Sequence, residues 1–476
     1  MKNIWIHQML ILTLSISCNG NPRQIDKTVN LAIPMSVQDS AMNRAARNYT
    51  NFCASCHYDD LSWFAKRDWK YGKSKDDIYV SIKTGYPDFG MPSYKNTFPE
   101  QEMHEIANYI HTKLELNKEE NEIKDQNRIQ TEKLNLRLDT VVSGLNVPWG
   151  MAFLPDGDMI VNEREGKMIR FRNGQKIAEI QGLPDIQSVG QGGLLDIRLH
   201  PDYKNNGWIY FAYTSSSISK NEGWNTALMR ARIKNNTLID KQLLFKAIPD
   251  SKTGHHVGCK ITFDGNGHVF FGVGERGKQE NAQDLSNDCG KIHRLNEDGT
   301  IPNDNPFVNR KGVQQSIWSY GHRNPQGLVY NTSTGKLWES EHGPKGGDEL
   351  NLIQSGKNYG WPVITFGINY DGTIITKDTS KVGMEQPITY WVPSIAPCGM
   401  TFVNSGKYKG WEGNVLLGSL RFRYLVRCEL AGNSVVHKEI LLPNIGRIRN
   451  VEMSPDGFIY IAVEEPGMIF RLVPVL

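Results

Sequence analysis

The sequence predicts a mainly β protein, a six-bladed β-propeller that follows a small all-α domain. A unit of strand, Pro/Asp/Asn/Gly turn and second strand recurs six times after residue 137, and a CxxCH motif precedes these repeats. With 476 residues the chain is too long for one ordinary core, so two or more domains are expected.

The composition is typical of a soluble globular chain. Hydrophobic residues make up 39% and charged residues 22%, and the net charge of +3 gives no reason to expect a nucleic-acid partner. The 45 glycines, with 11 tryptophans and 18 tyrosines, indicate tight turns between aromatic-rich strands.

The N-terminus is typical of an export signal. Lys2 supplies the positive start, and the apolar run 9–17 is too short to span a bilayer. The run stops at Cys18, as in a bacterial lipoprotein signal, although Ser15 stands where leucine is usual. A plain secretory signal is the alternative. We expect an exported protein of the periplasm or cell envelope, attached to a membrane only through a lipid anchor on Cys18.

The stretch FCASCH has the spacing of a c-type haem attachment site. Cys53 and Cys56 would form thioethers to the haem, and His57 would bind the iron. The alternative is a redox or zinc CxxC pair. A redox pair needs no adjacent histidine, and a zinc site needs more ligands than this segment offers. We therefore expect one covalently attached haem c.

The sixth iron ligand is expected to be Met91, because it lies between glycine and proline in a loop where core packing is poor. Met103, His104 and His111 are competitors, but they belong to a segment with helical periodicity and are better explained as helix residues. The whole segment 40–115 resembles a small class I cytochrome c.

A charged, amide-rich stretch follows, and it is typical of a linker. As a random coil of about 20 residues it would span roughly 25 Å. The chain is thus divided into a signal peptide 1–17, a tether 18–39, a cytochrome c domain 40–115, a linker 116–136 and a propeller 137–476.

The propeller prediction depends on six similar segments in order. Their strands carry Asp-Gly or Asn-Gly turn signals, and they begin at residues 149, 193, 258, 326, 399 and 450. A large β-sandwich is the alternative, but six ordered repeats disfavour it. Ligands of propellers gather over the central channel, so the residues of one site are expected to be scattered along the sequence.

Four arginines lie next to the predicted inner strands or their loops: Arg323, Arg421, Arg447 and Arg449. One arginine alone is usually a surface charge. A cluster of four favours an anion with several carboxylates or phosphates.

Several long motifs occur in order: GQGGLLDIRLHPD, GHRNPQGL, HGPKGGDELN, NYGWP and GRIRNVEMSPDG. Together they resemble the soluble quinoprotein glucose/aldose dehydrogenase family. Members of that family are six-bladed propellers that use pyrroloquinoline quinone and calcium, and the resemblance covers nearly all of 137–476.

The resemblance implies roles for individual residues. His255 matches the general base for the anomeric hydroxyl of the sugar, with its neighbour His256 as the rival. Gln191 matches a hydrogen-bonding residue beside the quinone. Arg323 and Asn324 match quinone-binding residues, and the guanidinium would polarise the carbonyl region that receives hydride.

Further positions match cofactor and metal ligands. Arg447 and Arg449 match the pair at the cofactor carboxylates, and Arg421 stands where the family usually has lysine. Gly343 and Pro344 match residues whose carbonyls bind the catalytic calcium.

A second, structural calcium site is implied at Asp348, Glu349 and Tyr359, with an ordinary acidic turn as the alternative. Cys259 and Val392 depart from the family, at positions where arginine and, in some members, a sugar-stacking tryptophan are found. These departures bear on the substrate more than on the reaction.

The resemblance implies PQQ-dependent oxidation of an aldose at C1 to its lactone. Electrons would pass to the haem and then to an external acceptor such as another cytochrome or a quinone. One alternative is a propeller that binds glycans or proteins without catalysis, with the haem as a sensor. Another is a quinoprotein dehydrogenase for a different alcohol or polyol. The remaining cysteines could form disulfides or stay free: Cys259, Cys289, Cys398 and Cys428.

Overall fold

The structure, a computed structural model, describes residues 41–57, 61, 69, 71–87, 91–116, 126–216 and 223–475. Cys18, with the predicted signal and tether, and the side chain of Cys56 lie outside this description. The expectations about export, lipidation and the second thioether therefore stay predictions.

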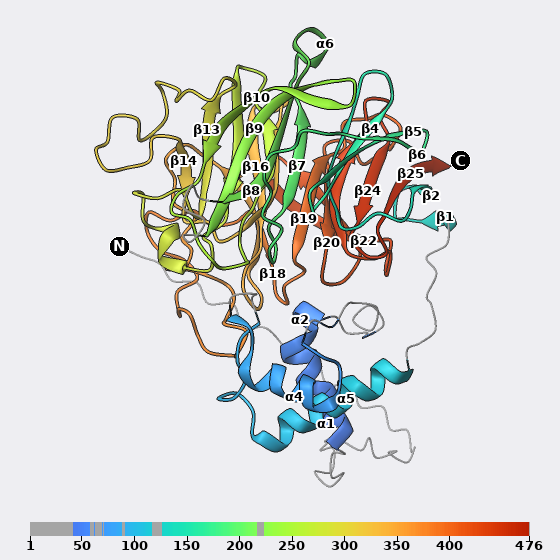
Figure 1. Cartoon of the computed structure of the whole chain (residues 1–476), viewed down its shortest axis with the longest axis vertical. Helices are drawn as coiled ribbons and strands as arrows, with labels where there is room; N and C mark the ends of the chain where they lie inside the picture. Colours follow the sequence, from blue (N-terminus) through green and yellow to red (C-terminus); the bar gives the residue numbers. More distant parts are fainter. Residues whose placement is uncertain are drawn as a thin grey trace, which may run out of the picture. The chain divides into compact units, whose positions relative to one another are not determined.

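The N-terminal part is helical, as expected (Figure 1). Tyr49, Ile82 and Ile106 are almost fully buried in one apolar cluster that several helices share. Its elements are α1 (Ala41–Asn48), a π-helical turn η1 (Tyr49–Cys53), α2 (Ala54–His57), α4 (Lys75–Thr84) and α5 (Glu100–Leu116).

Met103, His104 and His111 all lie within α5, as predicted. Met103 is buried in the helical core, and the ring of His104 stacks on Tyr79 at 3.8 Å. Met91 lies outside the helices, in a bridge with Tyr86 that closes a loop through two backbone hydrogen bonds. This loop position agrees with the predicted role of Met91, which stays a prediction.

Within the described residues the rest of the chain forms six antiparallel sheets of four or five strands, which confirms the propeller. The first strands of successive blades contact one another in a closed ring, in the order β3, β7, β11, β15, β19, β23 and back to β3.

The first three blades are β3 (Pro148–Phe153), β4 (Met159–Glu163), β5 (Lys167–Arg172) and β6 (Gln175–Glu179); β7 (Leu194–Leu199), β8 (Trp208–Ser216), β9 (Trp224–Lys234) and β10 (Thr237–Lys246); and β11 (Ile261–Phe263), β12 (His268–Val273), β13 (Lys291–Asn296) and β14 (Ile317–Tyr320). The next two are β15 (Pro325–Asn331), β16 (Lys336–Glu341), β17 (Asp348–Ile353) and β18 (Thr389–Trp391); and β19 (Pro397–Phe402), β20 (Val415–Ser419), β21 (Leu425–Ala431) and β22 (Ser434–Leu441). The sixth combines β23 (Ile448–Met453), β24 (Ile459–Val463) and β25 (Met468–Val475) with β2 (Asn135–Val142) and β1 (Gln126–Gln130), while α6 (Tyr203–Asn206) and the 3-10 turn η3 (Gln279–Ala282) lie in connections.

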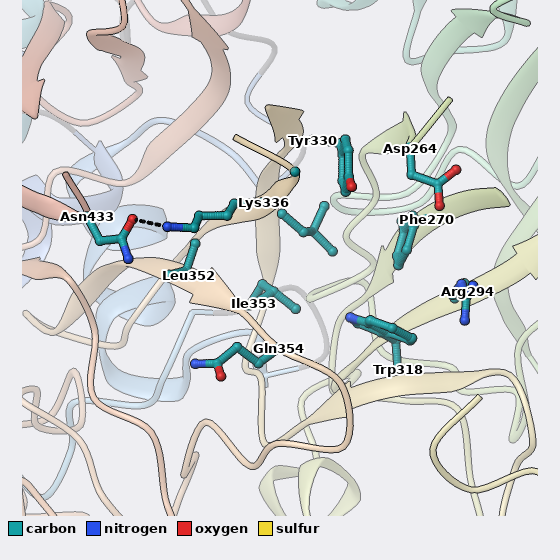
Figure 2. Close-up of a pocket in the computed structure, with 12 residues that line it drawn as sticks. Asp264, Phe270, Arg294, Trp318, Tyr330, Lys336, Leu352, Ile353, Gln354 and Asn433 are labelled. Carbon is teal, nitrogen blue, oxygen red and sulfur yellow. Dashed lines mark hydrogen bonds between the residues drawn. The ribbon is translucent and has the colours of Figure 1, made fainter. Parts of the chain in front are cut away.

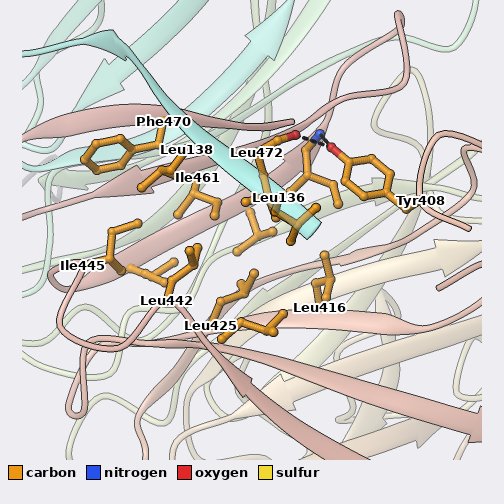
Figure 3. Packing of buried hydrophobic residues seen from close by; sticks show 14 of the residues in the cluster. Leu136, Leu138, Tyr408, Leu416, Leu425, Leu442, Ile445, Ile461, Phe470 and Leu472 are labelled. Carbon is orange, nitrogen blue, oxygen red and sulfur yellow. Dashed lines mark hydrogen bonds between the residues drawn. The ribbon is translucent and has the colours of Figure 1, made fainter. Parts of the chain in front are cut away.

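The ring closes by pairing the two ends of the propeller sequence. Leu138 of β2 lies opposite Leu472 of β25 in an antiparallel register. Figure 3 shows Leu136 and Leu138 among apolar side chains of the last two blades, where both are fully buried. Burial of each such side chain contributes about 1.5–3 kcal/mol, so closure does not depend on hydrogen bonds alone.

The linker prediction over 116–136 is wrong in its second half. Gln126–Gln130 forms β1, which pairs with β2 and places Ile129 opposite Leu136. This strand is the outermost of its sheet, with one neighbour, so its polar composition is compatible with pairing.

No helix in the described parts of the chain is both long enough and apolar enough to cross a membrane. The four cysteines left open by the sequence are separate buried thiols: Cys259, Cys289, Cys398 and Cys428.

Candidate active site

The residues predicted for the propeller site meet at one end of the blades. In an antiparallel blade the start of the first strand and the loop between the second and third strands lie at the same end. The predicted residues occupy these positions: Gln191 precedes β7, His255 precedes β11, Arg323 and Asn324 precede β15, Gly343 and Pro344 lie between β16 and β17, Arg421 lies between β20 and β21, and Arg447 and Arg449 lie at the start of β23.

The imidazole of His255 is mostly buried in the loop before β11. Burial, followed by the neighbouring His256, lowers the pKa of His255 to about 4. Its Nδ1 has no hydrogen-bond partner among the described residues. A Cβ on Gly277 would lie 2.1 Å from Nε2 of His255, so the ring rests where only glycine leaves space. His255 is thus a neutral base at neutral pH.

His256 has a different environment. Its Nδ1 lies 2.5 Å from a carboxylate oxygen of Glu275, and its backbone N–H donates to Oε1 of Gln191 at 2.9 Å. Burial acts to raise the pKa of Glu275, but His256, Arg323 and His255 together outweigh it, and the pKa lies below its ordinary value. His256 is therefore engaged by an ionised carboxylate, which leaves His255 as the better candidate base.

Arg323 connects two of the predicted groups. Its Nη1 donates to the carbonyl oxygens of His342 at 3.0 Å and Gly343 at 2.7 Å, and its guanidinium lies over the ring of Trp361. Its Nε is buried without a partner in the described structure. Asn324 accepts from the backbone N–H of Gly258 at 3.2 Å, so its amide oxygen already links two blades.

The loop predicted to bind the catalytic calcium is held by Asp348. One carboxylate oxygen of Asp348 accepts from the N–H of Gly343 at 2.8 Å, and the other accepts from Ser394, Ile395 and Ala396 at 2.6–2.7 Å. Burial raises the pKa of Asp348 to about 6. The Gly343 carbonyl oxygen accepts from the guanidinium of Arg323 and keeps a second lone pair. Carbonyl oxygens are among the ligands that calcium binds.

A buried acidic cluster lies next to this loop. Ligand atoms of His322, Glu339 and Glu341 all lie within 4.8 Å of one another, and Asn351 donates to Glu339, Glu341 and Glu349. Burial, followed by the charge of Glu341, raises the pKa of both Glu339 and Glu349 well above the ordinary value.

The three residues of the implied second calcium site have different partners, and their role as calcium ligands stays a prediction. Glu349 belongs to the acidic cluster, and the ring of Tyr359 stacks on His322 at 4.7 Å. The Asp348 carboxylate already accepts hydrogen bonds from four other donors. Because successive side chains of a strand point to opposite faces, Asp348 and Glu349 also lie on opposite faces of β17. Sequence reasoning missed Glu339 and Glu341. The signal that could have found them is their i, i+2 spacing on one strand, which places both carboxylates on the same face.

The other arginines form a positive group around one carboxylate. Nε of Arg447 and Nε of Arg449 donate to the two oxygens of Glu464 at 2.7 and 2.6 Å. Burial acts to raise the pKa of Glu464, but Arg449 and Arg447 outweigh it and hold the pKa far below its ordinary value. Arg421 donates to the Ser394 carbonyl at 3.0 Å, and its Nε has no partner within the described chain. Positive charge exceeds negative charge here, which suits a polyanionic ligand.

Sequence reasoning missed His342. Its backbone N–H donates to the carbonyl of Asn324, and its Nε2 lies 3.0 Å from the carbonyl oxygen of Pro397. Because a carbonyl only accepts, Nε2 carries the proton and Nδ1 is left as an acceptor. Burial, then Arg449 and Arg323, hold the pKa of His342 well below its ordinary value, so this ring is neutral.

The family departures lie in different places. Cys259 is fully buried in an apolar cluster and does not face the site. Val392 is 62% exposed and packs against Gly346, next to the calcium loop. Of these two residues, Val392 is the one that lies beside the candidate site.

A separate pocket of about 470 Å³ lies at the opposite end of the blades, since Asp264 follows β11 and Lys336 begins β16. Figure 2 shows the rings of Trp318 and Tyr330 in it, and Lys336 donates to Asn433 at 2.7 Å. Its lining residues are distinct from those of the candidate active site.

Comparison with known families agrees with both parts of the chain. The model described as Glucose / Sorbosone dehydrogenase matches residues 145–471, and the model described as Cytochrome C oxidase, cbb3-type, subunit III, matches residues 40–110.

Comparison with individual proteins gives the same result. Aldose sugar dehydrogenase YliI of Escherichia coli (strain K12) is 38% identical over 347 residues, covering 71% of this chain and 93% of that protein. Quinoprotein glucose dehydrogenase B of Acinetobacter calcoaceticus is 28% identical, covering 70% and 87%.

Among solved structures, the apo form of the soluble aldose sugar dehydrogenase from Escherichia coli aligns with a TM-score of 0.69 at 37% identity, covering 71% of this chain and all of that one. The PQQ-bound aldose sugar dehydrogenase from Streptomyces coelicolor aligns with a TM-score of 0.60 at 30% identity, covering 71% and 97%. The chain therefore belongs to the glucose/sorbosone dehydrogenase family of quinoproteins and carries a cytochrome c-type segment before its propeller.

Proposed function

We propose that the chain oxidises an aldose at C1 to its lactone, with pyrroloquinoline quinone as the hydride acceptor and haem c as the relay to an external acceptor. The observation that carries the proposal is the meeting of a neutral, mostly buried His255 with four arginines at one end of the propeller. Such a site offers a base and a polyanion-binding group together.

His255 supplies the base. Its low pKa keeps the imidazole unprotonated at neutral pH, so a nitrogen lone pair is free to take the proton of the anomeric hydroxyl. Gly277 beneath the ring and His256 beside it, which is hydrogen-bonded to Glu275, limit the motion of His255. A base held in one orientation needs less reorganisation when the substrate binds.

The arginines fit the cofactor. Arg447, Arg449, Arg323 and Arg421 would hold its carboxylates and carbonyls, and the buried Nε atoms of Arg323 and Arg421 remain available as donors among the described residues. When bound, pyrroloquinoline quinone supplies the carbonyl that accepts hydride. The Gly343 and Pro344 carbonyls would hold the calcium, and Asp348 fixes their loop through the Gly343 N–H.

The haem would be attached to Cys53 and Cys56, with His57 and Met91 as axial ligands. Joining an electron acceptor to the dehydrogenase in one chain raises its effective concentration relative to a diffusing acceptor. We further propose export to the cell envelope and lipidation at Cys18, for which the N-terminal pattern is the support. Loss of palmitate labelling in Cys18→Ser is the expected result.

The experiment that tests the function measures the reduced-haem α-band. Haem-matured protein is loaded with the quinone and calcium, and a panel of aldoses, alcohols and polyols is added. We expect aldose-dependent haem reduction that requires the quinone. His255→Ala should lose it, whereas His437→Ala, which changes an exposed histidine on β22, should keep it.

A parallel assay with a small dye acceptor separates the possible failures. Dye reduction without haem reduction would show that the haem is not the acceptor. Turnover of a polyol but no aldose would overturn the substrate class. A loaded protein that turns over none of the panel would contradict the enzymatic proposal and favour a binding role.

A further inference from the structure

The loop 253–256, which carries His255, has an unusual backbone. His256 has φ of +55°, and Arg276 on the facing connection after β12 has φ of +64°. Both values lie in the left-handed region, which non-glycine residues rarely adopt without support from their surroundings. The surrounding contacts must therefore hold this loop in place.

Arg276 provides those contacts. Its side chain is almost fully buried, and its guanidinium donates to the carbonyl oxygens of His255 at 2.7 Å, Thr253 at 2.9 Å and Trp224 at 3.3 Å. These three acceptors are all backbone carbonyls. One planar side chain thus fixes two carbonyls of the His255 loop and joins them to β9.

The connection is made in both directions. The hydroxyl of Thr253 donates to the carbonyl of Arg276 at 2.8 Å, and the backbone N–H of Arg276 lies 3.3 Å from the carbonyl of His256. The next residue, Gly277, is the one on which Nε2 of His255 rests. Displacing Arg276 would therefore change the loop and the surface beneath the ring together.

The groups around His255 also affect its pKa. His256, Arg276 and Arg323 disfavour a proton on His255, whereas Glu275 favours one. Burial lowers the pKa of Arg276 to about 10, so its guanidinium is still charged at neutral pH. Loss of that charge should make His255 easier to protonate.

We propose that Arg276 is a positioning residue for His255, which it holds through the His255 and Thr253 carbonyls so that the imidazole rests on Gly277. The inference rests on the proposed role of His255 as the base. Arg276 itself would touch neither sugar nor cofactor.

The test uses full-length protein with two substitutions. Arg276→Met removes the charge and all three hydrogen bonds, whereas Arg276→Lys keeps the charge but offers a single ammonium in place of a planar fork. Arg427→Met is the matched control, because Arg427 is also fully buried but lies on β21, where it binds Glu439. Two readouts are taken: sugar turnover with a dye acceptor, and NMR titration of labelled histidines, with His255→Gln giving the assignment.

In Arg276→Met we expect kcat to fall roughly 10²-fold with KM little changed, since small displacements of a catalytic group have effects of that size. The His255 titration should move upward toward its ordinary value. Arg276→Lys should lower kcat by roughly tenfold while the His255 titration stays low, because the positive charge remains. Arg427→Met should lower thermal stability but leave the titration unchanged.

The proposal is overturned if both Arg276 variants keep kcat within about twofold and leave the His255 resonances in place. It is also overturned if the control shifts those resonances equally, because Arg276 would then act only through general stability. Should Arg276→Met fail to fold, Arg276→Lys is judged by the same two criteria. Absence of turnover in the wild type would refute the proposed function, while the NMR comparison would still decide the positioning role.

Discussion

Lowering the pH tests the proposed base directly, because the structure lowers the pKa of His255 to about 4 through burial and the adjacent His256. An ordinary histidine with a pKa near 6.5 would be only about 9% neutral at pH 5.5, whereas a histidine with a pKa near 4 would be about 97% neutral. The two cases differ roughly tenfold in the amount of competent base. Turnover that depends on His255 should therefore persist well into the acidic range.

The assay is kcat/KM for an aldose from pH 4 to 8, with preloaded protein and a dye acceptor, because this ratio reports the pKa of the free enzyme. We expect a plateau above about pH 5 and an acid limb centred near 4. The sign follows from the low pKa: the competent neutral form is present above it and is lost as pH falls through it. An acid limb between pH 6 and 7, with His255 titrating there by NMR, would refute the reasoning.

Three further predictions concern the surroundings of the site. Glu464→Gln should lower the free energy of unfolding by about 3–5 kcal/mol in chemical denaturation, because it leaves Arg447 and Arg449 buried without their carboxylate; a loss below about 1 kcal/mol would contradict this. Calcium at about 100 times its dissociation constant should raise the unfolding free energy of the wild type by roughly 2.7 kcal/mol, and Glu339→Gln should keep this shift because the proposed ligands are the Gly343 and Pro344 carbonyls; loss of the shift would instead assign the ion to the cluster of His322, Glu339 and Glu341. Val392→Trp should lower KM for aldoses about threefold to tenfold, because it adds an aromatic face beside the calcium loop. The control is Val436→Trp, which changes an exposed valine on β22 and should leave KM unchanged.

The acidic cluster shows why the sequence alone could not predict the partners of Asp348 and Glu349. Asp348 and Glu349 are adjacent in sequence, and a motif comparison assigns both to one site. In the strand they point to opposite faces, so Asp348 supports the Gly343 loop while Glu349 joins Glu339. Glu341 lies opposite Glu349 in the hairpin of β16 and β17, a register that depends on the geometry of the connecting loop and that the motif does not state.

The assignment of the base shows the same limit. Sequence motifs favour His255 over His256 by its distance from Gly258, but both residues have the same chemistry. Only the fold shows that His256 is occupied by Glu275 while His255 is neutral and rests on a glycine.

The sequence by itself determined the architecture of this protein, because its signals are local. Period-two strands and Asn-Gly or Asp-Gly turns specify each blade within a few tens of residues, and the CxxCH spacing predicts haem attachment within one helical turn. Tertiary structure decided the rest. It recruited polar Gln126–Gln130 into the closing sheet, placed Glu464 between two arginines and brought Arg276 beneath the His255 loop. Arg447 and Arg449 lie 17 and 15 residues from Glu464, and Arg276 lies 21 residues from His255, each time within one blade. Partners at such separations are set by how the loops and strands of a blade fold onto one another, and a period-two or turn pattern does not record them.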